Sequence, residues 1–280
     1  MLRRLSSNVV DRLEPDGTYR RALDGFAAPL LASVRQCEPG ALAVTLDAMP
    51  GEEERGLALV RRILGVDRRL DAWDRSAAKV PWLRGLAQRM RGVKPPRYPT
   101  LWETCVNAII FQQISLIAAG AIMRRTIEAL GSAVEAGGAV LYAFPSAAGV
   151  ADAPEAVLRG AGLSGAKIAA LRAIATALLE GRLDEAMLEE RSSVEAAELL
   201  CTLRGIGPWT AALILLRGLG RLDVFPINDS GAARSLALLS GGKEVDLEAA
   251  LRTLGAQRGL LYYHLLLARL DARGELAQSD

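Results

Sequence analysis

The most informative stretch of this sequence is Leu203-Arg204-Gly205-Ile206-Gly207-Pro208-Trp209-Thr210-Ala211-Ala212. Its two glycines permit a positive φ and a close approach of the backbone, and Pro208 suits the first position of a following helix. Because a helical pattern also precedes the glycines, the segment predicts two helices joined by a tight turn. Such a turn directs unpaired amides and a helix N-terminus outward, where they can bind a phosphate of a nucleic-acid backbone.

The same glycines fit two other interpretations. A dinucleotide-binding turn needs a preceding strand and a third glycine, and the sequence offers neither, so we reject it. A glycine-rich turn between two helices, without any ligand, stays open on this segment alone.

A second motif lies about twenty residues further on and reads Asp223-Val224-Phe225-Pro226-Ile227-Asn228-Asp229-Ser230-Gly231-Ala232-Ala233-Arg234. Pro226 stops an extended chain, and Asp229 stands where a helix should begin. A lone Asp at that place is usually an N-cap worth about 1 kcal/mol. The spacing between Asp229 and the glycine turn is what favours a functional role.

This combination resembles the helix-hairpin-helix DNA glycosylase superfamily, in which a hairpin is followed by a short loop and a catalytic aspartate. The segment Asn107 to Leu116, which contains Gln112-Gln113-Ile114-Ser115, resembles a second signature of the AlkA-type, or DNA-3-methyladenine glycosylase II, branch. The resemblance runs from about residue 95 to residue 270. It implies a mainly α, two-lobed fold over residues 76–280, with the hairpin at 203–208.

A small N-terminal α/β domain is expected over residues 1–75. Residues 30–35 and 42–46 alternate between apolar and polar around Pro39 and Gly40, which predicts a half-buried hairpin. Three consecutive glutamates at 52–54 then open a helical pattern that ends at Gly65. From about residue 67 onward we expect helices only, with no further strand pair.

The resemblance implies a monofunctional DNA N-glycosylase that flips and excises alkylated purines from double-stranded DNA in base excision repair. Asp229 would be the catalytic carboxylate, because cleaving the base–sugar bond builds positive charge on the sugar and a helix N-terminus favours the ionised acid. Four residues would line the substrate pocket: Trp209, Leu213, Tyr262 and Leu266. Six would contact DNA: Gln112, Gln113, Arg204, Gly205, Gly207 and Thr210.

Trp209 bears on the type of reaction. In bifunctional glycosylase/lyases the corresponding residue is a lysine that forms a Schiff base with the sugar. A tryptophan forms no such adduct but can stack on a cationic base, with filling of the core as the alternative role. Leu213 and Leu266 stand where the branch usually has aromatic residues, so stacking should be weaker unless Tyr262 or Tyr263 substitutes.

Other positions carry expectations with open alternatives. Gln113 would enter the gap left by the flipped base, although Gln112 and Gln113 also fit a buried capping pair. The main-chain carbonyls of Cys201, Leu203 and Ile206 match those that bind a monovalent cation in the family. Arg204, Lys167 and Arg234 are candidate phosphate contacts or solvated side chains. His264, the single histidine, is expected to be buried rather than catalytic.

The charge balance and the cysteine spacing limit which partners and cofactors the protein can have. Lys and Arg total 34 against 32 Asp and Glu, so a nucleic-acid interface must be a local patch. The three cysteines, Cys37, Cys105 and Cys201, have no zinc or iron–sulfur spacing, and no cofactor is expected. No run of about 18 apolar residues appears and Met1 to Asn8 lack a signal-peptide core, so we expect a cytoplasmic protein without a membrane segment. A DNA glycosylase would be associated with the nucleoid, and we expect it to be a monomer.

Two alternatives stay open: a glycosylase for uracil, hypoxanthine or an ethenopurine, and a non-catalytic damage-binding protein.

Overall fold

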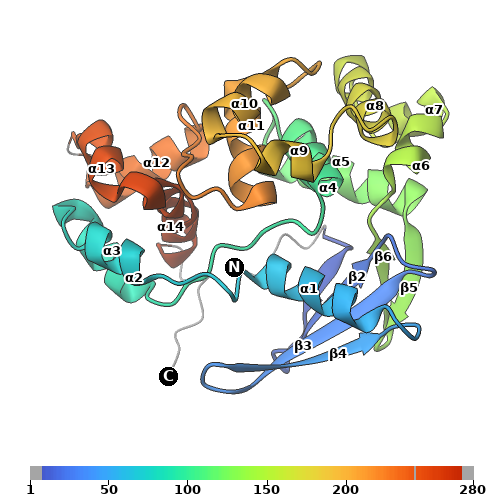
Figure 1. Ribbon diagram of the computed structural model, residues 1–280, viewed down its shortest axis with the longest axis horizontal. Helices are drawn as coiled ribbons and strands as arrows, with labels where there is room; N and C mark the ends of the chain where they lie inside the picture. The colour runs from blue at the N-terminus through green and yellow to red at the C-terminus, as the bar shows by residue number, and fades with distance from the viewer. Residues whose placement is uncertain (1–7, 243, 273–280) are drawn as a thin grey trace.

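The computed structural model describes residues 8–242 and 244–272, and Figure 1 shows how its helices and strands are arranged. The expectation that Met1 to Asn8 lack a signal-peptide core therefore concerns residues that, except for Asn8, lie outside the described part of the chain. An N-terminal sheet with a covering helix is followed by two helical lobes (Figure 1). Within the described ranges, no helix combines the length and apolar character needed to cross a membrane.

The N-terminal unit is a four-stranded antiparallel sheet with the order β1-β2-β3-β4. These strands are Asp11–Leu13, Tyr19–Leu23, Leu30–Glu38 and Ala41–Asp47. The predicted hairpin is confirmed as β3 and β4, in which Val34 lies opposite Val44. Helix α1, Glu53–Leu64, is also confirmed and ends at Gly65 with φ 65°. Its Val60 and Ile63 pack with alternate residues of β3, which explains the half-buried pattern of that strand.

The expectation of no further strand pair is wrong. Strands β5, Ser132–Ala136, and β6, Ala139–Ala143, form an antiparallel hairpin inside the helical region. Leu141 and Ala143 of β6 pack with Ala22 of β2, so the hairpin lies beside the N-terminal sheet (Figure 1). Two of the five residues in each strand are alanine, a strong helix former, so local propensity conceals a pairing that tertiary contacts stabilise.

The first helical lobe is built around α8, Gly165–Leu179, whose Leu171 and Ile174 are fully buried. Residues 101–130 form two helices separated by a turn at residues 111–115. The helices of this lobe besides α8 are α4 (Leu101–Ile110), α5 (Leu116–Leu130), α6 (Ala147–Asp152), α7 (Glu155–Gly160), α9 (Glu185–Glu189) and α10 (Ser193–Cys201).

The second lobe has its own core, in which Trp73, Leu83 and Tyr263 are buried. Its helices are α2 (Asp71–Ala77), α3 (Pro81–Arg89), α12 (Ser230–Leu239), α13 (Leu247–Leu254) and α14 (Arg258–Asp271). The domain boundary expected between residues 75 and 76 falls inside α2, which packs in this lobe. The N-terminal sheet and the second lobe are thus joined by a short connector before α2.

Helix α11, Pro208–Ile214, and the π-helical turn that continues it, Leu215–Leu219, join the two lobes. Ala211 and Ile214 belong to the core of the first lobe, whereas Leu213 and Leu216 belong to that of the second. The hairpin predicted from the sequence therefore stands at the junction between the lobes, with its second helix fixed on both sides.

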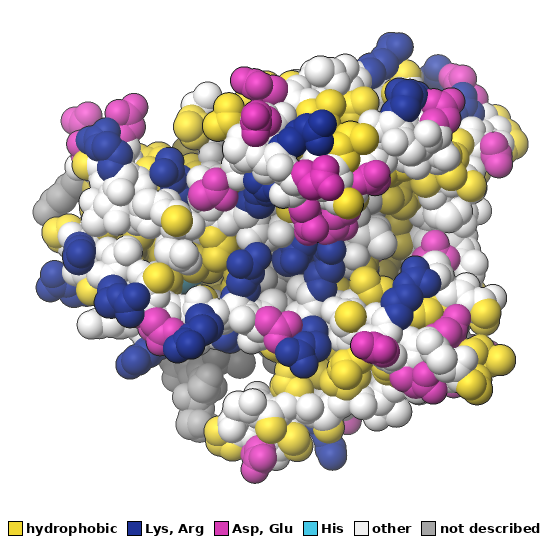
Figure 2. Space-filling view, in the orientation of Figure 1, with side chains coloured by type: hydrophobic (Ala, Val, Ile, Leu, Met, Phe, Trp, Pro, Cys, Tyr) yellow, Lys and Arg dark blue, Asp and Glu magenta, His cyan; other side chains and the backbone are white. Residues whose placement is uncertain are grey.

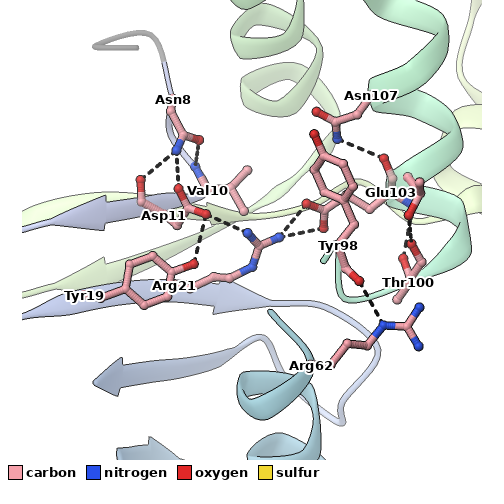
Figure 3. Close-up of polar contacts among 11 residues, drawn as sticks. Asn8, Val10, Asp11, Tyr19, Arg21, Arg62, Tyr98, Thr100, Glu103 and Asn107 are labelled. Atoms are coloured by element: carbon pink, nitrogen blue, oxygen red, sulfur yellow. Dashed lines mark hydrogen bonds and ion pairs between the residues drawn. The ribbon is translucent and has the colours of Figure 1, made fainter. Parts of the chain in front are cut away.

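A buried ion cluster attaches the sheet to the first lobe (Figure 3). Arg21 of β2 donates to Asp11 at 2.7 Å and to the two carboxylate oxygens of Glu103 on α4 at 2.5 and 2.7 Å. Burial alone would lower the pKa of Arg21, but the Glu103 and Asp11 carboxylates raise it well above its usual value. The guanidinium therefore stays charged, and removing either acid would leave it buried with incomplete pairing.

We expect Glu103→Gln to lower the free energy of unfolding by about 3 kcal/mol, because it removes one partner of a buried charge. Urea denaturation followed by circular dichroism measures this change. Asp67→Asn is the control, since the Arg61–Asp67 pair is more than half exposed and its loss should leave the midpoint unchanged. Equal midpoints for Glu103→Gln and the native protein would contradict the role of this cluster.

Candidate active site

Asp229 lies at the N-terminus of α12, where its Oδ1 accepts a hydrogen bond from the Ala232 amide at 2.7 Å. The preceding residue, Asn228, has a positive φ of 64°, a conformation that Asn tolerates better than most residues. This left-handed residue turns the chain sharply after Pro226. The carboxylate is therefore placed by a strained turn on one side and by the helix cap on the other.

Two further groups contact the other oxygen of the same carboxylate. Trp209 on α11 donates its indole Nε1–H to Oδ2 of Asp229 at 3.0 Å, and the Tyr262 hydroxyl on α14 lies 3.4 Å from Oδ2. Burial and the neighbouring Asp229 carboxylate raise the pKa of Tyr262, so its hydroxyl remains protonated and can donate. Three elements that are distant in sequence thus converge on Asp229.

The four predicted pocket residues lie in one apolar region beside this carboxylate. Leu213 and Tyr262 are buried, whereas Trp209 and Leu266 are half-buried at the edge of the same core. Phe225 is a further pocket residue that was not predicted from the sequence, and its ring meets that of Tyr262 edge-on at a centroid distance of 6.3 Å. Its place in the sequence, next to Pro226 and four residues before Asp229, could have indicated that it lies beside the carboxylate. The indole edge of Trp209 faces Asp229, a contact that stacking alone did not predict.

The two glycines of the hairpin have different roles. Gly205 has φ 83°, and a Cβ added there would lie 2.6 Å from the Cβ of Ala170 on α8. Gly207 is the N-cap of α11 with φ −101°, and a Cβ added there would meet nothing within 4 Å. Gly205 therefore permits the turn itself. Gly207 leaves open space in front of the first amides of α11, which have no partner within the helix.

The turn between α4 and α5 is tied to this hairpin. Gln112 donates from Nε2 to the Gly205 carbonyl at 2.9 Å and to the Thr210 hydroxyl at 2.6 Å. Gln113 is exposed and has a positive φ of 57°. Thr210 is expected to contact DNA, and because its side chain is only 3% exposed, that contact would fall to its backbone amide.

The basic candidates fall into two groups. Arg204 and Arg234 are exposed and free to reach a phosphate. Lys167 instead donates to the carbonyls of Ile110 and Gln112, at 2.5 and 3.0 Å, and burial lowers the pKa of its ammonium group. Lys167 therefore holds the end of α4 and the following turn in place.

His264 is buried at 1% exposure, as the sequence favours. Its Nδ1 donates to the Leu260 carbonyl at 2.9 Å, and its ring lies 4.5 Å from that of Trp73. Burial lowers the pKa of the imidazole, so the ring is neutral near pH 7. His264 is accordingly a core residue of the second lobe.

The carbonyls expected to hold a monovalent cation come from the last residue of α10, Cys201, and from Leu203 and Ile206 in the turn. The Leu203 carbonyl accepts the Ile206 amide at 3.1 Å, and a carbonyl oxygen retains a second lone pair for an ion. The donor chemistry fits a monovalent cation, whose presence stays a prediction.

Comparison with known proteins supports this picture. Residues 106–257 match a family model described as HhH-GPD superfamily base excision DNA repair protein. The chain is 28% identical over 196 residues to a DNA-3-methyladenine glycosylase of Bacillus subtilis, covering 69% of this chain and 65% of that protein. It is 30% identical over 198 residues to a probable bifunctional transcriptional activator/DNA repair enzyme AlkA of Mycobacterium tuberculosis, covering 69% of this chain and 39% of that protein.

A solved structure, the 3-methyladenine DNA-glycosylase from Archaeoglobus fulgidus, superimposes with a TM-score of 0.80 at 27% identity. The superposition covers 95% of this chain and 91% of the other. The mainly α, two-lobed fold and the N-terminal sheet are therefore shared along nearly the whole chain.

We expect Gly205→Ala to destabilise the protein by about 1 to 3 kcal/mol, because it combines a left-handed residue with a clash against Ala170. Gly207→Ala is the matched control and should melt like the native protein. Differential scanning calorimetry gives both values. Similar melting temperatures for the two variants would show that the turn does not depend on Gly205.

Proposed function

Because this chain belongs to the HhH-GPD superfamily of base excision DNA repair proteins, we propose that it is a monofunctional DNA N-glycosylase acting on alkylated purines in double-stranded DNA. The observation that carries this proposal is the Asp229 carboxylate, held by Trp209 of the hairpin and by the N-terminus of α12. The relatives named for 3-methyladenine support the choice of an alkylated purine.

The reaction breaks the bond between the base and C1′ of the sugar. The base departs with the bonding electron pair, C1′ gains positive charge, and water then adds to C1′ and loses a proton. A fixed carboxylate beside C1′ stabilises that charge, and such a preorganised group typically contributes about 100-fold or more to the rate. Trp209, Tyr262 and the Ala232 amide hold the Asp229 oxygens in place, so little reorganisation is needed.

The pocket favours a base that leaves readily. An alkylated purine such as 3-methyladenine already carries positive charge, so it needs no strong general acid, and the buried, neutral His264 supplies none. The donors of Trp209 and Tyr262 both face Asp229. A neutral lesion such as uracil or hypoxanthine would need donors toward the leaving base, and the apolar Leu213 and Leu266 provide none.

DNA binding would depend on a local surface. Figure 2 shows Lys and Arg side chains interspersed with Asp and Glu on the face it displays, in keeping with a net charge of +2. We therefore assign the phosphate contacts to the amides at Gly205 and Gly207 and to the exposed Arg204. Backbone amides contact phosphates and carry no sequence information, so binding should show little sequence preference.

We expect the native protein to release free 3-methyladenine from methylated duplex DNA, and Asp229→Asn to reduce the single-turnover rate by about 100-fold or more while leaving duplex affinity unchanged or slightly tighter. Chromatography of the released bases, across duplexes with alkylated and neutral lesions, measures both activity and lesion range. Asp246→Asn is the control, because Asp246 caps α13 through the Ala249 amide in the same way. A fully active Asp229→Asn protein would remove this carboxylate from the mechanism.

The absence of an amine at position 209 predicts glycosylase activity without strand cleavage. Adding borohydride during turnover should trap no covalent protein–DNA adduct, and strands should break only after alkali or an added abasic endonuclease. Lys167, which holds the turn that Gln112 joins to the hairpin, already donates to two carbonyls. A trapped adduct that disappears in Lys167→Arg would reveal lyase chemistry and overturn the monofunctional assignment.

A further inference from the structure

The stretch of chain over residues 75–94 concentrates positive charge. We call it the basic segment. The chain as a whole carries 34 Lys and Arg against 32 Asp and Glu. The basic segment contains no acidic residue, so in the rest of the chain acids outnumber bases. Its six basic residues are Arg75, Lys79, Arg84, Arg89, Arg91 and Lys94. A chain with a net charge near zero needs such a local patch if charge is to attract a nucleic acid.

The basic segment lies on the outside of the second lobe. It covers the end of α2, the whole of α3 and the start of the connector that follows. Leu83 and Leu86 of α3 are buried in the core of this lobe, whereas Arg84 is exposed. Figure 2 shows Lys and Arg side chains gathered over α2 and α3, at the left of the view.

Carboxylates neutralise little of this charge. Arg91 lies 3.9 Å from Asp74, but the Arg91 side chain is 82% exposed, so the pair is weak. Within the described ranges, Arg75, Lys79 and Arg84 form no ion pair. These three cations are therefore available to an anionic partner.

The kind of partner follows from what this surface lacks. None of the large apolar side chains that are exposed in the described residues belongs to the basic segment. A protein interface needs such side chains at its centre. A helix that lies on a membrane needs a free apolar face, and that of α3 is buried in the core. A nucleic-acid backbone needs only positive charge, so it fits this surface best.

We propose that the basic segment is a second surface for duplex DNA, which binds backbone phosphates whether or not a damaged base is present. It is separate from the hairpin, which stands at the junction of the lobes (Figure 1). The choice of duplex DNA rests on the proposed function. The amides of the hairpin carry no net charge, so the basic segment would supply most of the salt-dependent affinity.

The test measures affinity for an undamaged duplex by fluorescence anisotropy over a series of NaCl concentrations. Each cation bound to a phosphate steepens the fall of log affinity with log salt by about 0.9. The triple variant Arg75→Gln, Lys79→Gln, Arg84→Gln should therefore show a slope smaller by about 2 to 3. In about 0.1 M salt it should bind about tenfold more weakly or worse.

The control removes the same number of positive charges from exposed arginines outside the second lobe, each paired with a glutamate: Arg12→Gln, Arg159→Gln and Arg182→Gln. This variant should keep the native slope. Equal losses in the two triple variants would reduce the effect to net charge and overturn the proposal. Native affinity and slope in the variant of the basic segment would overturn it as well.

Two further outcomes separate this inference from its alternatives. If the variant of the basic segment loses binding to phosphatidylserine vesicles but keeps native duplex affinity, the surface serves a membrane and the proposal is overturned. If the native protein binds the duplex with the predicted slope but releases no base, the proposed function fails and this inference stands. Release of 3-methyladenine by a protein whose basic segment can be neutralised without loss of affinity would reject this inference alone.

Discussion

The hydrogen bond from the Trp209 indole to the Asp229 carboxylate is the constraint on which the site depends. It joins the second helix of the hairpin to the first turn of α12 at 3.0 Å. Both ends are fixed independently, Trp209 by a helix packed into both lobes and Asp229 by its cap to Ala232. The carboxylate is therefore placed relative to the hairpin before any substrate arrives, which is the condition for electrostatic preorganisation.

A second set of contacts extends this rigidity to the turn between α4 and α5. Lys167 holds the turn from α8, and Gln112 holds it against the hairpin. Gly205 allows the close approach of the hairpin to α8. The surface that would bind backbone, the carboxylate that would act at C1′ and the exposed edge at Gln113 consequently belong to one body. The fold therefore holds the groups that would position a flipped base in place before DNA binds.

The sequence predicted those parts of the structure whose signal is local. Gly205 and Gly207, the proline after them and Asp229 at a helix start each restrict the local backbone, and their spacing predicted the candidate site, whose role stays a prediction. Longer-range contacts gave no such signal. Arg21 and Glu103 are 82 residues apart, and Gln112 meets Thr210 across 98 residues. Strands β5 and β6 were missed because their alanines favour a helix and the contacts that stabilise the pair lie elsewhere in the chain.

The most direct test of this account is a crystal structure of the Asp229→Asn protein bound to a duplex with one stable alkylated-purine analogue. The account predicts that the altered nucleotide is rotated out of the stack, with its C1′ beside residue 229 and its base among Trp209, Leu213 and Tyr262. A phosphate should lie on the amides of the hairpin. A lesion that remains stacked while the duplex is bound at the hairpin, or a duplex bound elsewhere, would contradict it.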